Sequence, residues 1–423
     1  MSNYLIRGGK RLTGEVTISG SKNAALGILA AAIVCDGPCT IENVPIVSDT
    51  MVMIDIIKDI GGKCNFDNGV LSIDPRGIQN SYVSSDRARD IRASYYLLGA
   101  LLARLSSVNT VLPGGCDFGT RPIDLHLKGF EAMGAISSIS HGRIKLESKQ
   151  LQGANIFLDK VSVGATINLM ICAAKCPGRT VIENAAREPH IVDVANFLNT
   201  MGAKIRGAGT EMIRIDGVPT LDAGRNYSII PDQIEAGTYM IAAAVTKGDI
   251  KVKNLIPKHM EPLTAKLKEM GAVVEEGDDY CRVYIPEGRT LTATNFITMP
   301  YPGFPTDLQP QAVVLLCSAD GLSRMTETVW ANRFQYVDDL KKMGAEIDVA
   351  DRFCLVHGPC ELTGSLVQAR DLRAGAAMVL AGLCASDDTE IYDIFRLERG
   401  YESLVSKLQN LGADIRVIES DRH

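Results

Sequence analysis

The distribution of apolar and polar residues along the chain repeats six times. Six amphipathic segments each end in a large apolar residue followed by glycine and usually alanine, and the glycines are Gly61, Gly134, Gly202, Gly271, Gly344 and Gly412. A glycine at this place can adopt the left-handed conformation that ends a helix. Alternating segments such as 346–349 and 414–417 follow directly, as expected for half-buried strands. The pattern predicts six units, each made of a helix, a glycine cap and a strand.

A second, more apolar helix is predicted between successive units. These segments begin at Lys22, Arg92, Gly164, Glu235, Thr306 and Arg373. Because they are apolar nearly all round, we expect them in the interior, with the amphipathic helices and the sheets packed over them.

The spacing of the capping glycines groups the six units into two sets of three. Each of the first three glycines lies 210 residues before one of the last three, as in 271 − 61. A continuous solenoid would show no such grouping. We therefore predict an α/β fold of two homologous lobes that join near 227–231, and we expect the substrate in a cleft between them.

The composition is that of a globular protein with two domains. The chain has 423 residues, 46% hydrophobic and 22% charged, and one core rarely grows to that length. The net charge of −6 and the single tryptophan argue against nucleic-acid binding. Without a leader pattern or an apolar run long enough to span a bilayer, we expect a cytoplasmic protein that does not bind membranes. The sequence leaves the oligomeric state open and is compatible with a monomer.

Most of the eleven cysteines are predicted to be reduced thiols in the core. Five of them lie inside apolar helical patterns, namely Cys35, Cys172, Cys176, Cys317 and Cys384, and the total is odd. Cys172 and Cys176 lack the spacing of a zinc site and a nearby pair of histidines. The chain has no HExxH, Walker A or GxGxxG motif, so we predict no metal site.

The segment 113–125 is the strongest candidate for chemistry. Three glycines surround Cys116, so the backbone can bend and approach a ligand closely. Pro122 is predicted to begin a helix, which places Arg121 at a helix N-terminus. The cation and the helix amides would both favour a thiolate at Cys116. The alternative, a cysteine packed as a small apolar side chain, is less favoured because Phe118 is its only apolar neighbour.

Cations recur at or just before predicted helix N-termini, where a positive charge is normally unfavourable. These cations are Lys22, Arg92, Arg121, Lys160, Arg187, Arg333, Arg373 and Arg399. A bound anion would relieve the conflict. The alternative for each cation is solvation or pairing with a neighbouring acid such as Asp90, Glu188, Asp371 or Glu398. The set as a whole favours a site for a small polyanion that carries phosphate and carboxylate groups.

Position alone does not make the neighbouring acids catalytic. Asp307 and Glu235 lie at predicted helix starts, where an acid is stabilising, so helix capping is the favoured interpretation of both. His126 follows the Cys116 loop, and a role in the core is favoured over proton transfer.

Six motifs, in the right order along essentially the whole chain, resemble the UDP-N-acetylglucosamine 1-carboxyvinyltransferase family. They are 19–26, 113–126, 160–166, 304–307, 371–374 and 399–402. Members of this family are enolpyruvyl transferases of the EPSP synthase-like superfamily, and they begin bacterial peptidoglycan synthesis.

The resemblance implies two inside-out α/β barrels, each of three repeated units with helices at the centre and sheets outside. It also implies that the N-terminal strand crosses over to the second barrel. The first barrel would then be 21–229 with the loop 113–125, and the second would combine 1–20 with 230–423. The active site is implied to lie in the cleft between them.

The reaction implied by the resemblance uses phosphoenolpyruvate and UDP-N-acetylglucosamine. The 3′-hydroxyl of the sugar adds to C2 of phosphoenolpyruvate while a proton goes to C3, and the tetrahedral intermediate then eliminates phosphate. No metal or organic cofactor is implied.

The resemblance also assigns residues to this reaction. Lys22, Arg121 and Arg399 are similar to the residues that hold phosphoenolpyruvate, where positive charge suits the anion and the transition state. Asp307 resembles the base for the sugar hydroxyl. Cys116 resembles the acid at C3, which is also the thiol that the antibiotic fosfomycin alkylates. The other implied substrate-binding and supporting residues are Asn23, Arg92, Pro122, Ile123, Asp124, Leu125, Lys160, Val161, Ser162, Val163, Val329, Arg333, Asp371 and Arg373.

Two other functions stay open. Enolpyruvyl transferases that use shikimate 3-phosphate lack the Cys116 loop, which makes that acceptor the weaker alternative. A non-catalytic paralogue that senses the nucleotide sugar would keep the cations but could lose Cys116 or Asp307, and both are present.

Overall fold

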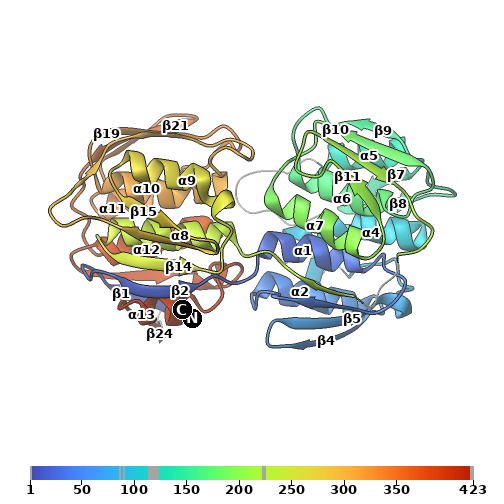
Figure 1. The fold of residues 1–423 in the computed structure, drawn as a ribbon, viewed down its shortest axis with the longest axis horizontal. Helices are drawn as coiled ribbons and strands as arrows, with labels where there is room; N and C mark the ends of the chain where they lie inside the picture. The colour runs from blue at the N-terminus through green and yellow to red at the C-terminus, as the bar shows by residue number, and fades with distance from the viewer. Residues whose placement is uncertain (1, 85–86, 89–90, 113–122, 222–224, 420–423) are drawn as a thin grey trace. The chain divides into compact units, whose positions relative to one another are not determined.

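The chain divides into two compact units of mixed helix and sheet. The computed structural model describes residues 2–84, 87–88, 91–112, 123–221 and 225–419 (Figure 1). Unit 1 combines Met1–Ser19 with Pro231–His423, and unit 2 is Gly20–Ile230.

Unit 2 has three buried helices that pack against one another. They are α1 (Lys22–Ala32), α4 (Tyr96–Leu105) and α6 (Val163–Ala173). The added Cβ of an alanine at Gly99 on α4 would lie 2.2 Å from the carbonyl oxygen of Asn168 on α6. Only glycine therefore permits this approach of the two core helices. Three further helices of the unit are α2 (Ser48–Asp59), α5 (Asp124–Ala132) and α7 (Pro189–Thr200).

The described residues of unit 2 also form three sheets. The first has the order β13-β3-β5-β4, with β3 (Cys39–Glu42), β4 (Lys63–Asp67), β5 (Val70–Asp74) and β13 (Asn226–Ser228). The second has the order β6-β8-β7, with β6 (Ser107–Val111), β7 (Ile136–Ser140) and β8 (Arg143–Glu147). The third has the order β11-β12-β10-β9, with β9 (Asn155–Phe157), β10 (Arg179–Glu183), β11 (Lys204–Arg206) and β12 (Met212–Asp216).

Unit 1 repeats this plan, with helices inside and strands outside (Figure 1). Its buried helices are α8 (Gln233–Val245), α10 (Gln309–Cys317) and α12 (Leu372–Cys384), which contact one another. Its other helices are α9 (Pro257–Glu269), α11 (Val337–Lys342) and α13 (Leu404–Asn410).

The N-terminal residues supply strands to two of the three sheets of unit 1. β1 (Ser2–Arg7) pairs antiparallel with both β23 (Asp388–Tyr392) and β24 (Asp414–Glu419), and β22 (Leu366–Gln368) completes that sheet. The second sheet has the order β15-β16-β14-β2, with β2 (Thr13–Thr17), β14 (Asp249–Lys253), β15 (Val273–Glu276) and β16 (Tyr280–Tyr284). The third sheet contains β17 (Leu291–Thr292), β18 (Asn295–Ile297), β19 (Ala319–Thr326), β20 (Ile347–Val349) and β21 (Phe353–Gly358).

The six predicted glycine caps are confirmed by the backbone. Gly61, Gly134, Gly202, Gly271, Gly344 and Gly412 all have φ between 95° and 111°. Each follows a helix and precedes a strand, so the predicted unit of helix, cap and strand recurs six times. The more apolar helices are buried along nearly their whole length, as expected for interior helices.

Three predicted helix starts need correction. The segments from Arg92 and Thr306 begin with 3-10 turns, η2 (Arg92–Tyr95) and η3 (Thr306–Leu308), as is common before an α-helix. The helix expected from Pro122 begins at Asp124 with Ile123 in the cap position, and Pro122 itself lies outside the described residues. The short 3-10 elements η1 (Pro75–Gly77) and η4 (Ile394–Arg396) were not expected.

Candidate active site

Two arginines and one aspartate from separate segments of unit 1 form the centre of the candidate site. Asp307 lies on η3, and its Oδ2 accepts hydrogen bonds from Nη2 and Nε of Arg373 at 2.9 and 3.2 Å. Nη2 of Arg333 lies 3.9 Å from Oδ1 of Asp307 and donates to the carbonyl of Thr306 at 3.4 Å. The structure thus brings together three residues that the sequence analysis singled out.

Arg373 is held in place by interactions of its backbone and of its side chain. It is the second residue of α12, and the side chain of Asp371 caps this helix by accepting the N–H groups of Arg373 and Ala374 at 2.9 and 3.2 Å. The Arg373 side chain is only 5% exposed. Burial lowers the pKa of Arg373, but the charge of Asp307 raises it, and the pKa ends above its ordinary value. Asp371 therefore caps the helix while Asp307 pairs with the cation, whereas the sequence offered Asp371 as a pairing partner.

The ring of Tyr401, whose hydroxyl belongs to a buried polar cluster, also contacts Arg373. Its guanidinium lies 5.7 Å from the centre of the Tyr401 ring, within the range of a cation–π contact. The hydroxyl of Tyr401 lies 2.9 Å from that of Thr238 and accepts a hydrogen bond from Nε2 of Gln311 at 3.1 Å. The motif 399–402 contains Tyr401, but the sequence analysis gave this residue no role.

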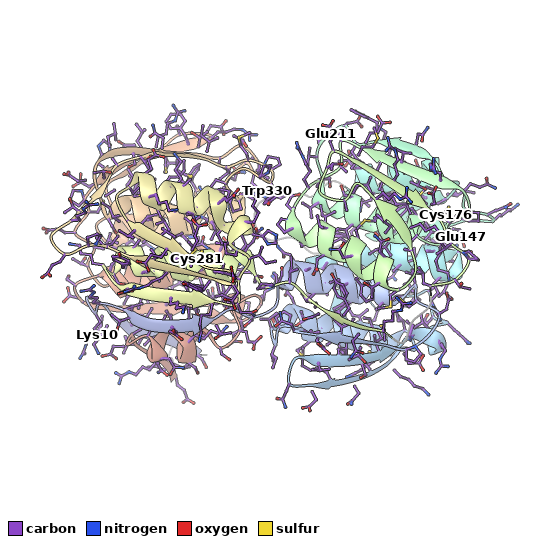
Figure 2. All side chains as sticks on the ribbon, viewed as in Figure 1. Lys10, Glu147, Cys176, Glu211, Cys281 and Trp330 are labelled. Carbon is purple, nitrogen blue, oxygen red and sulfur yellow. The ribbon has the colours of Figure 1, made fainter. Side chains whose placement is uncertain are left out.

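Glu327 is a fully buried carboxylate that joins the Asp307 segment to the loop after β19. Its Oε2 accepts a hydrogen bond from the hydroxyl of Thr306 at 2.8 Å. Its Oε1 accepts hydrogen bonds from the N–H groups of Val329 and Trp330 at 2.7 and 3.0 Å and from Thr298 at 2.9 Å; Trp330 is labelled in Figure 2. Sequence reasoning missed Glu327, because an acid at the end of an alternating strand is normally exposed.

Replacement of Glu327 by alanine should therefore disturb Asp307 and Val329 together. Four donors would lose their acceptor, and a buried unsatisfied group costs about 1 to 3 kcal/mol. We expect a lower melting temperature, a higher KM for the nucleotide sugar and a lower kcat, measured by thermal denaturation and steady-state kinetics. Glu327→Gln keeps one acceptor oxygen and should restore most of the activity. Equal losses in both variants would contradict a positioning role.

Unit 2 contributes a second set of predicted residues at helix starts. Lys22 is the first residue of α1, after the capping side chain of Ser21. Its Nζ lies 3.2 Å from Oδ2 of Asp49, and the two side chains are 11% and 5% exposed. Asp49 lies in the first turn of α2. The sequence analysis did not predict it as a site residue, because an acid in the first turn commonly stabilises a helix.

The other predicted residues of unit 2 also lie at helix starts. Lys160 and Val161 are exposed, and the next residue, Ser162, caps α6 by accepting the N–H of Ala165 at 3.2 Å. Val163 is the first residue of α6. Asn23 follows Lys22 on α1, Ile123 precedes α5, Asp124 and Leu125 begin that helix, and Arg92 begins η2.

Five predicted residues remain, and the structure describes two of them, Arg399 and Val329. Cys116, Arg121 and Pro122 lie outside the described residues. Arg399 is half-buried between η4 and α13 in unit 1. Val329 is exposed beside Trp330.

His126 has the core role that the sequence favoured. It is buried on α5, and its Nδ1 lies 3.0 Å from Nδ2 of Asn168. Burial lowers the pKa of His126 to about 4, so the ring stays neutral at physiological pH.

Helix capping is the wrong interpretation of Glu235. The residue that caps α8 is Asp232, whose side chain accepts the N–H groups of Ile234 and Glu235. The carboxylate of Glu235 instead pairs with Lys407 at 2.6 Å and accepts the N–H of Ser19 at 2.8 Å. Asp307 likewise pairs with cations, and Leu308 occupies the cap position of α10.

The described cysteines are all free thiols, as predicted. Cys35, Cys172, Cys176 and Cys317 are buried, whereas Cys384 is partly exposed. Within the described ranges, no group of three or more His, Cys, Asp or Glu side chains could hold a metal ion.

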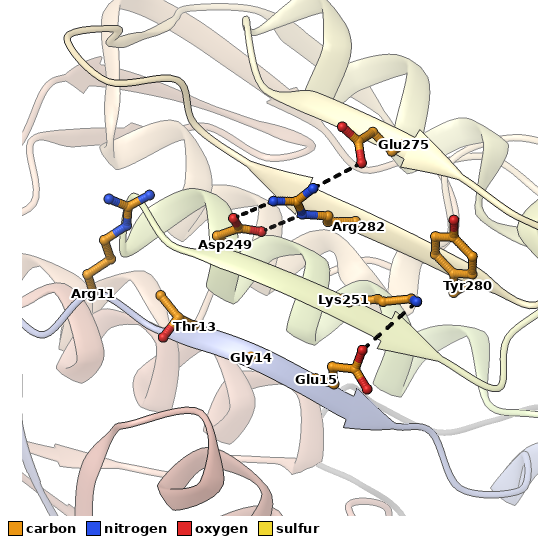
Figure 3. A pocket seen from close by; sticks show the side chains of 9 residues that line it. All are labelled: Arg11, Thr13, Gly14, Glu15, Asp249, Lys251, Glu275, Tyr280 and Arg282. Carbon is orange, nitrogen blue, oxygen red and sulfur yellow. Dashed lines mark hydrogen bonds and ion pairs between the residues drawn. The ribbon is translucent and has the colours of Figure 1, made fainter.

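A pocket of about 480 Å³ lies on the sheet that contains β2, β14, β15 and β16 (Figure 3). None of the predicted site residues lines it. Arg282 donates to both carboxylate oxygens of Asp249 at 2.8 Å and also reaches Glu275, and Lys251 lies 3.9 Å from Glu15 (Figure 3). Because these carboxylates and cations form ion pairs with one another, the pocket is not the candidate active site.

Comparison with known proteins identifies the family of the chain. The model of the EPSP synthase (3-phosphoshikimate 1-carboxyvinyltransferase) family matches residues 6–408. A UDP-N-acetylglucosamine 1-carboxyvinyltransferase of Caldanaerobacter subterraneus subsp. tengcongensis is 52% identical, over 98% of this chain and 99% of its own. Another, of Halothermothrix orenii, is 50% identical over 99% of this chain and 100% of its own.

Solved structures show the same fold. The enolpyruvyl transferase NikO from Streptomyces tendae has a TM-score of 0.91 at 27% identity, and the match covers 99% of both chains. EPSP synthase from Acinetobacter baumannii has a TM-score of 0.78 at 20% identity, over 99% of this chain and 100% of its own, and indicates the fold alone. The chain therefore belongs to the EPSP synthase family of enolpyruvyl transferases, and within it to the UDP-N-acetylglucosamine 1-carboxyvinyltransferases.

Proposed function

We propose that this chain transfers the enolpyruvyl group of phosphoenolpyruvate to the 3′-hydroxyl of UDP-N-acetylglucosamine and releases phosphate, the first committed step of peptidoglycan synthesis. The observation that carries the proposal is the full-length identity to relatives that bear the name of this activity. The pairing of Asp307 with Arg373 supports it, because a carboxylate held by a fixed cation is suited to orient a hydroxyl nucleophile.

In the proposed mechanism, Asp307 accepts the proton of the sugar hydroxyl as that oxygen attacks C2 of phosphoenolpyruvate. Arg373 and Arg333 orient the Asp307 carboxylate, and Asp371 fixes the start of the helix that carries Arg373. Val329 contributes to binding of the nucleotide sugar, as does Pro122, which lies outside the described residues. The residues at the helix starts of unit 2 that contribute are Asn23, Arg92, Ile123, Asp124, Leu125, Lys160, Val161, Ser162 and Val163.

Positive charge holds phosphoenolpyruvate in this proposal. Lys22 of unit 2 and Arg399 of unit 1 act with Arg121 on the phosphate and carboxylate groups and stabilise charge that develops in the transition state. Cys116 donates the proton to C3 of phosphoenolpyruvate. Breaking of the bond between C2 and the phosphate oxygen then completes the elimination. Residues of both units thus contribute to one reaction.

The purified protein should release phosphate from phosphoenolpyruvate only when UDP-N-acetylglucosamine is present. The measurement is a phosphate assay with UDP-N-acetylglucosamine and shikimate 3-phosphate offered separately, with and without a metal chelator. We expect turnover with the first acceptor alone and no effect of the chelator. Equal turnover with shikimate 3-phosphate would contradict the assignment, and binding of the nucleotide sugar without turnover would support a non-catalytic paralogue.

The location and assembly of the protein are further predictions. No helix within the described ranges combines the length and the hydropathy that crossing a bilayer requires. A cytoplasmic location and a monomeric state stay predictions, to be checked by cell fractionation and by light scattering of the purified chain.

A further inference from the structure

Two cysteines that the proposed reaction does not use lie side by side in unit 1. Cys317 is the last residue of α10, and Cys360 follows β21. The N–H of Cys360 donates to the carbonyl of Cys317 at 2.7 Å. Standard bond lengths then hold the two Cα atoms within about 6.6 Å of each other, and disulfides span about 4.4 to 6.8 Å between Cα atoms. A disulfide between them needs no large backbone movement.

The surroundings of the two thiols differ. Cys317 is buried, whereas Cys360 is partly exposed. The two thiols also shift each other's pKa in opposite directions, upward for Cys317 and downward for Cys360. The Cys360 sulfur accepts the N–H of Glu346 at 3.4 Å, and its S–H donates to the carbonyl oxygen of His357 at 3.3 Å. Cys360 is therefore the accessible member of the pair, and the N–H of Glu346 is a donor that can stabilise its thiolate.

The surroundings of Cys360 shift its pKa in opposite directions. The interaction with Cys317, the N–H of Glu346 and the charge of His357 lower the pKa of Cys360. Burial and the charge of Glu346 raise it, and the net pKa is about 7. The other partly exposed thiols in the described ranges differ, because burial raises the pKa of Cys64 to about 11 and that of Cys384 to about 12.

We propose that Cys360 and Cys317 form a peroxide-sensitive thiol pair, in which Cys360 is oxidised first and Cys317 then closes a disulfide. The Cys360 thiolate attacks one oxygen of a hydroperoxide, the O–O bond breaks, and a sulfenic acid forms while the other oxygen leaves as hydroxide or alkoxide. The Cys317 sulfur, after losing its proton to water, attacks the sulfenic sulfur and displaces hydroxide. With hydrogen peroxide, two thiols and one peroxide give one disulfide and two waters.

The order of the two steps follows from the electrostatics. The hydrogen bond to Cys360, together with burial, holds the pKa of Cys317 well above its ordinary value in the reduced protein. Once Cys360 becomes a neutral sulfenic acid, the repulsion between two thiolates disappears, and Cys317 ionises more readily. The disulfide would tie the C-terminal end of α10 to the segment after β21, whereas η3, which carries Asp307, precedes the N-terminal end of α10.

The test uses the full-length protein and hydrogen peroxide. After oxidation, the remaining thiols are blocked with N-ethylmaleimide, and the protein is digested and analysed by mass spectrometry without reduction. We expect a peptide pair linked through Cys317 and Cys360, which Cys360→Ser abolishes and the control Cys64→Ser retains. In Cys317→Ser, dimedone should trap the sulfenic acid on Cys360. At pH 7, N-ethylmaleimide should label Cys360 at least about tenfold faster than Cys64.

A reversible rise in melting temperature on oxidation, absent in Cys360→Ser, would support the pair. Oxidation confined to other cysteines, or labelling of Cys360 no faster than that of Cys64, would overturn the proposal. Because Cys360 takes no part in the proposed reaction, Cys360→Ser should keep its turnover. The result for the thiol pair is thus independent of the result for the enolpyruvyl transfer.

Discussion

Replacement of Asp307 by asparagine is expected to lower turnover about 10²- to 10⁴-fold, because an amide cannot accept the proton of the sugar hydroxyl. The amide can still accept a hydrogen bond from Arg373, so the loss of the charge should cost only about 1 to 3 kcal/mol of folding stability. Steady-state kinetics and thermal denaturation of the same preparation separate the two effects. The binding constant of the nucleotide sugar should change much less than kcat.

The chain offers a matched control for this variant. Asp249 is also paired with an arginine through two hydrogen bonds in unit 1, and its side chain is 31% exposed, compared with 33% for Asp307. It lies in the charge-paired pocket of Figure 3, which contains no predicted site residue. Asp249→Asn should keep normal turnover. Near-normal turnover of Asp307→Asn would instead assign Asp307 a purely structural role.

Replacement of Lys22 by glutamine should lower kcat/KM for phosphoenolpyruvate about 10²- to 10³-fold, the effect of removing one preorganised electrostatic contact. The Asp49 carboxylate would also lose its cation, so the melting temperature should fall. Kinetics with phosphoenolpyruvate varied at saturating UDP-N-acetylglucosamine measure the first effect, and thermal denaturation measures the second.

Lys175 provides the control for the loss of a half-buried cation in unit 2. Its Nζ lies 2.6 Å from Asp36, and its side chain is 18% exposed, compared with 11% for Lys22. Lys175→Gln should lose stability without a change in KM for phosphoenolpyruvate. An equal change in KM in both variants, or none in Lys22→Gln, would show that Lys22 does not hold this substrate.

Much of the fold could be predicted because the determining interactions are local. A helix that ends in glycine needs that glycine for its own backbone geometry, and Gly61 and Gly412 have the expected positive φ. The apolar helices could be predicted as interior because an all-round apolar surface must be covered, as the burial of α1 and α12 shows.

The contacts of the candidate site were harder to predict because they join residues far apart in the sequence. Arg373 could be placed at a helix start, but its pairing with Asp307 depends on how α12 packs beside η3. Glu235 and Asp232 are both acids at the start of α8, and only the position of Lys407 on α13 distinguishes the buried ion pair from the cap. Glu327 shows no sequence signal, because its four donors come from three separate segments.

The sequence by itself determined the repeated unit, the grouping of six units into two sets of three, the helices that become buried and the positions of the cations at helix starts. These properties follow from hydrophobic periodicity, glycine conformation and charge, which act over a few residues. The tertiary structure alone decided that β1 pairs with β23 and β24, that Arg373 takes Asp307 as its partner, and that Cys317 meets Cys360. The physical reason is that such pairs form only after packing brings distant segments together, and a one-dimensional pattern does not record which of several chemically equivalent partners lies within reach.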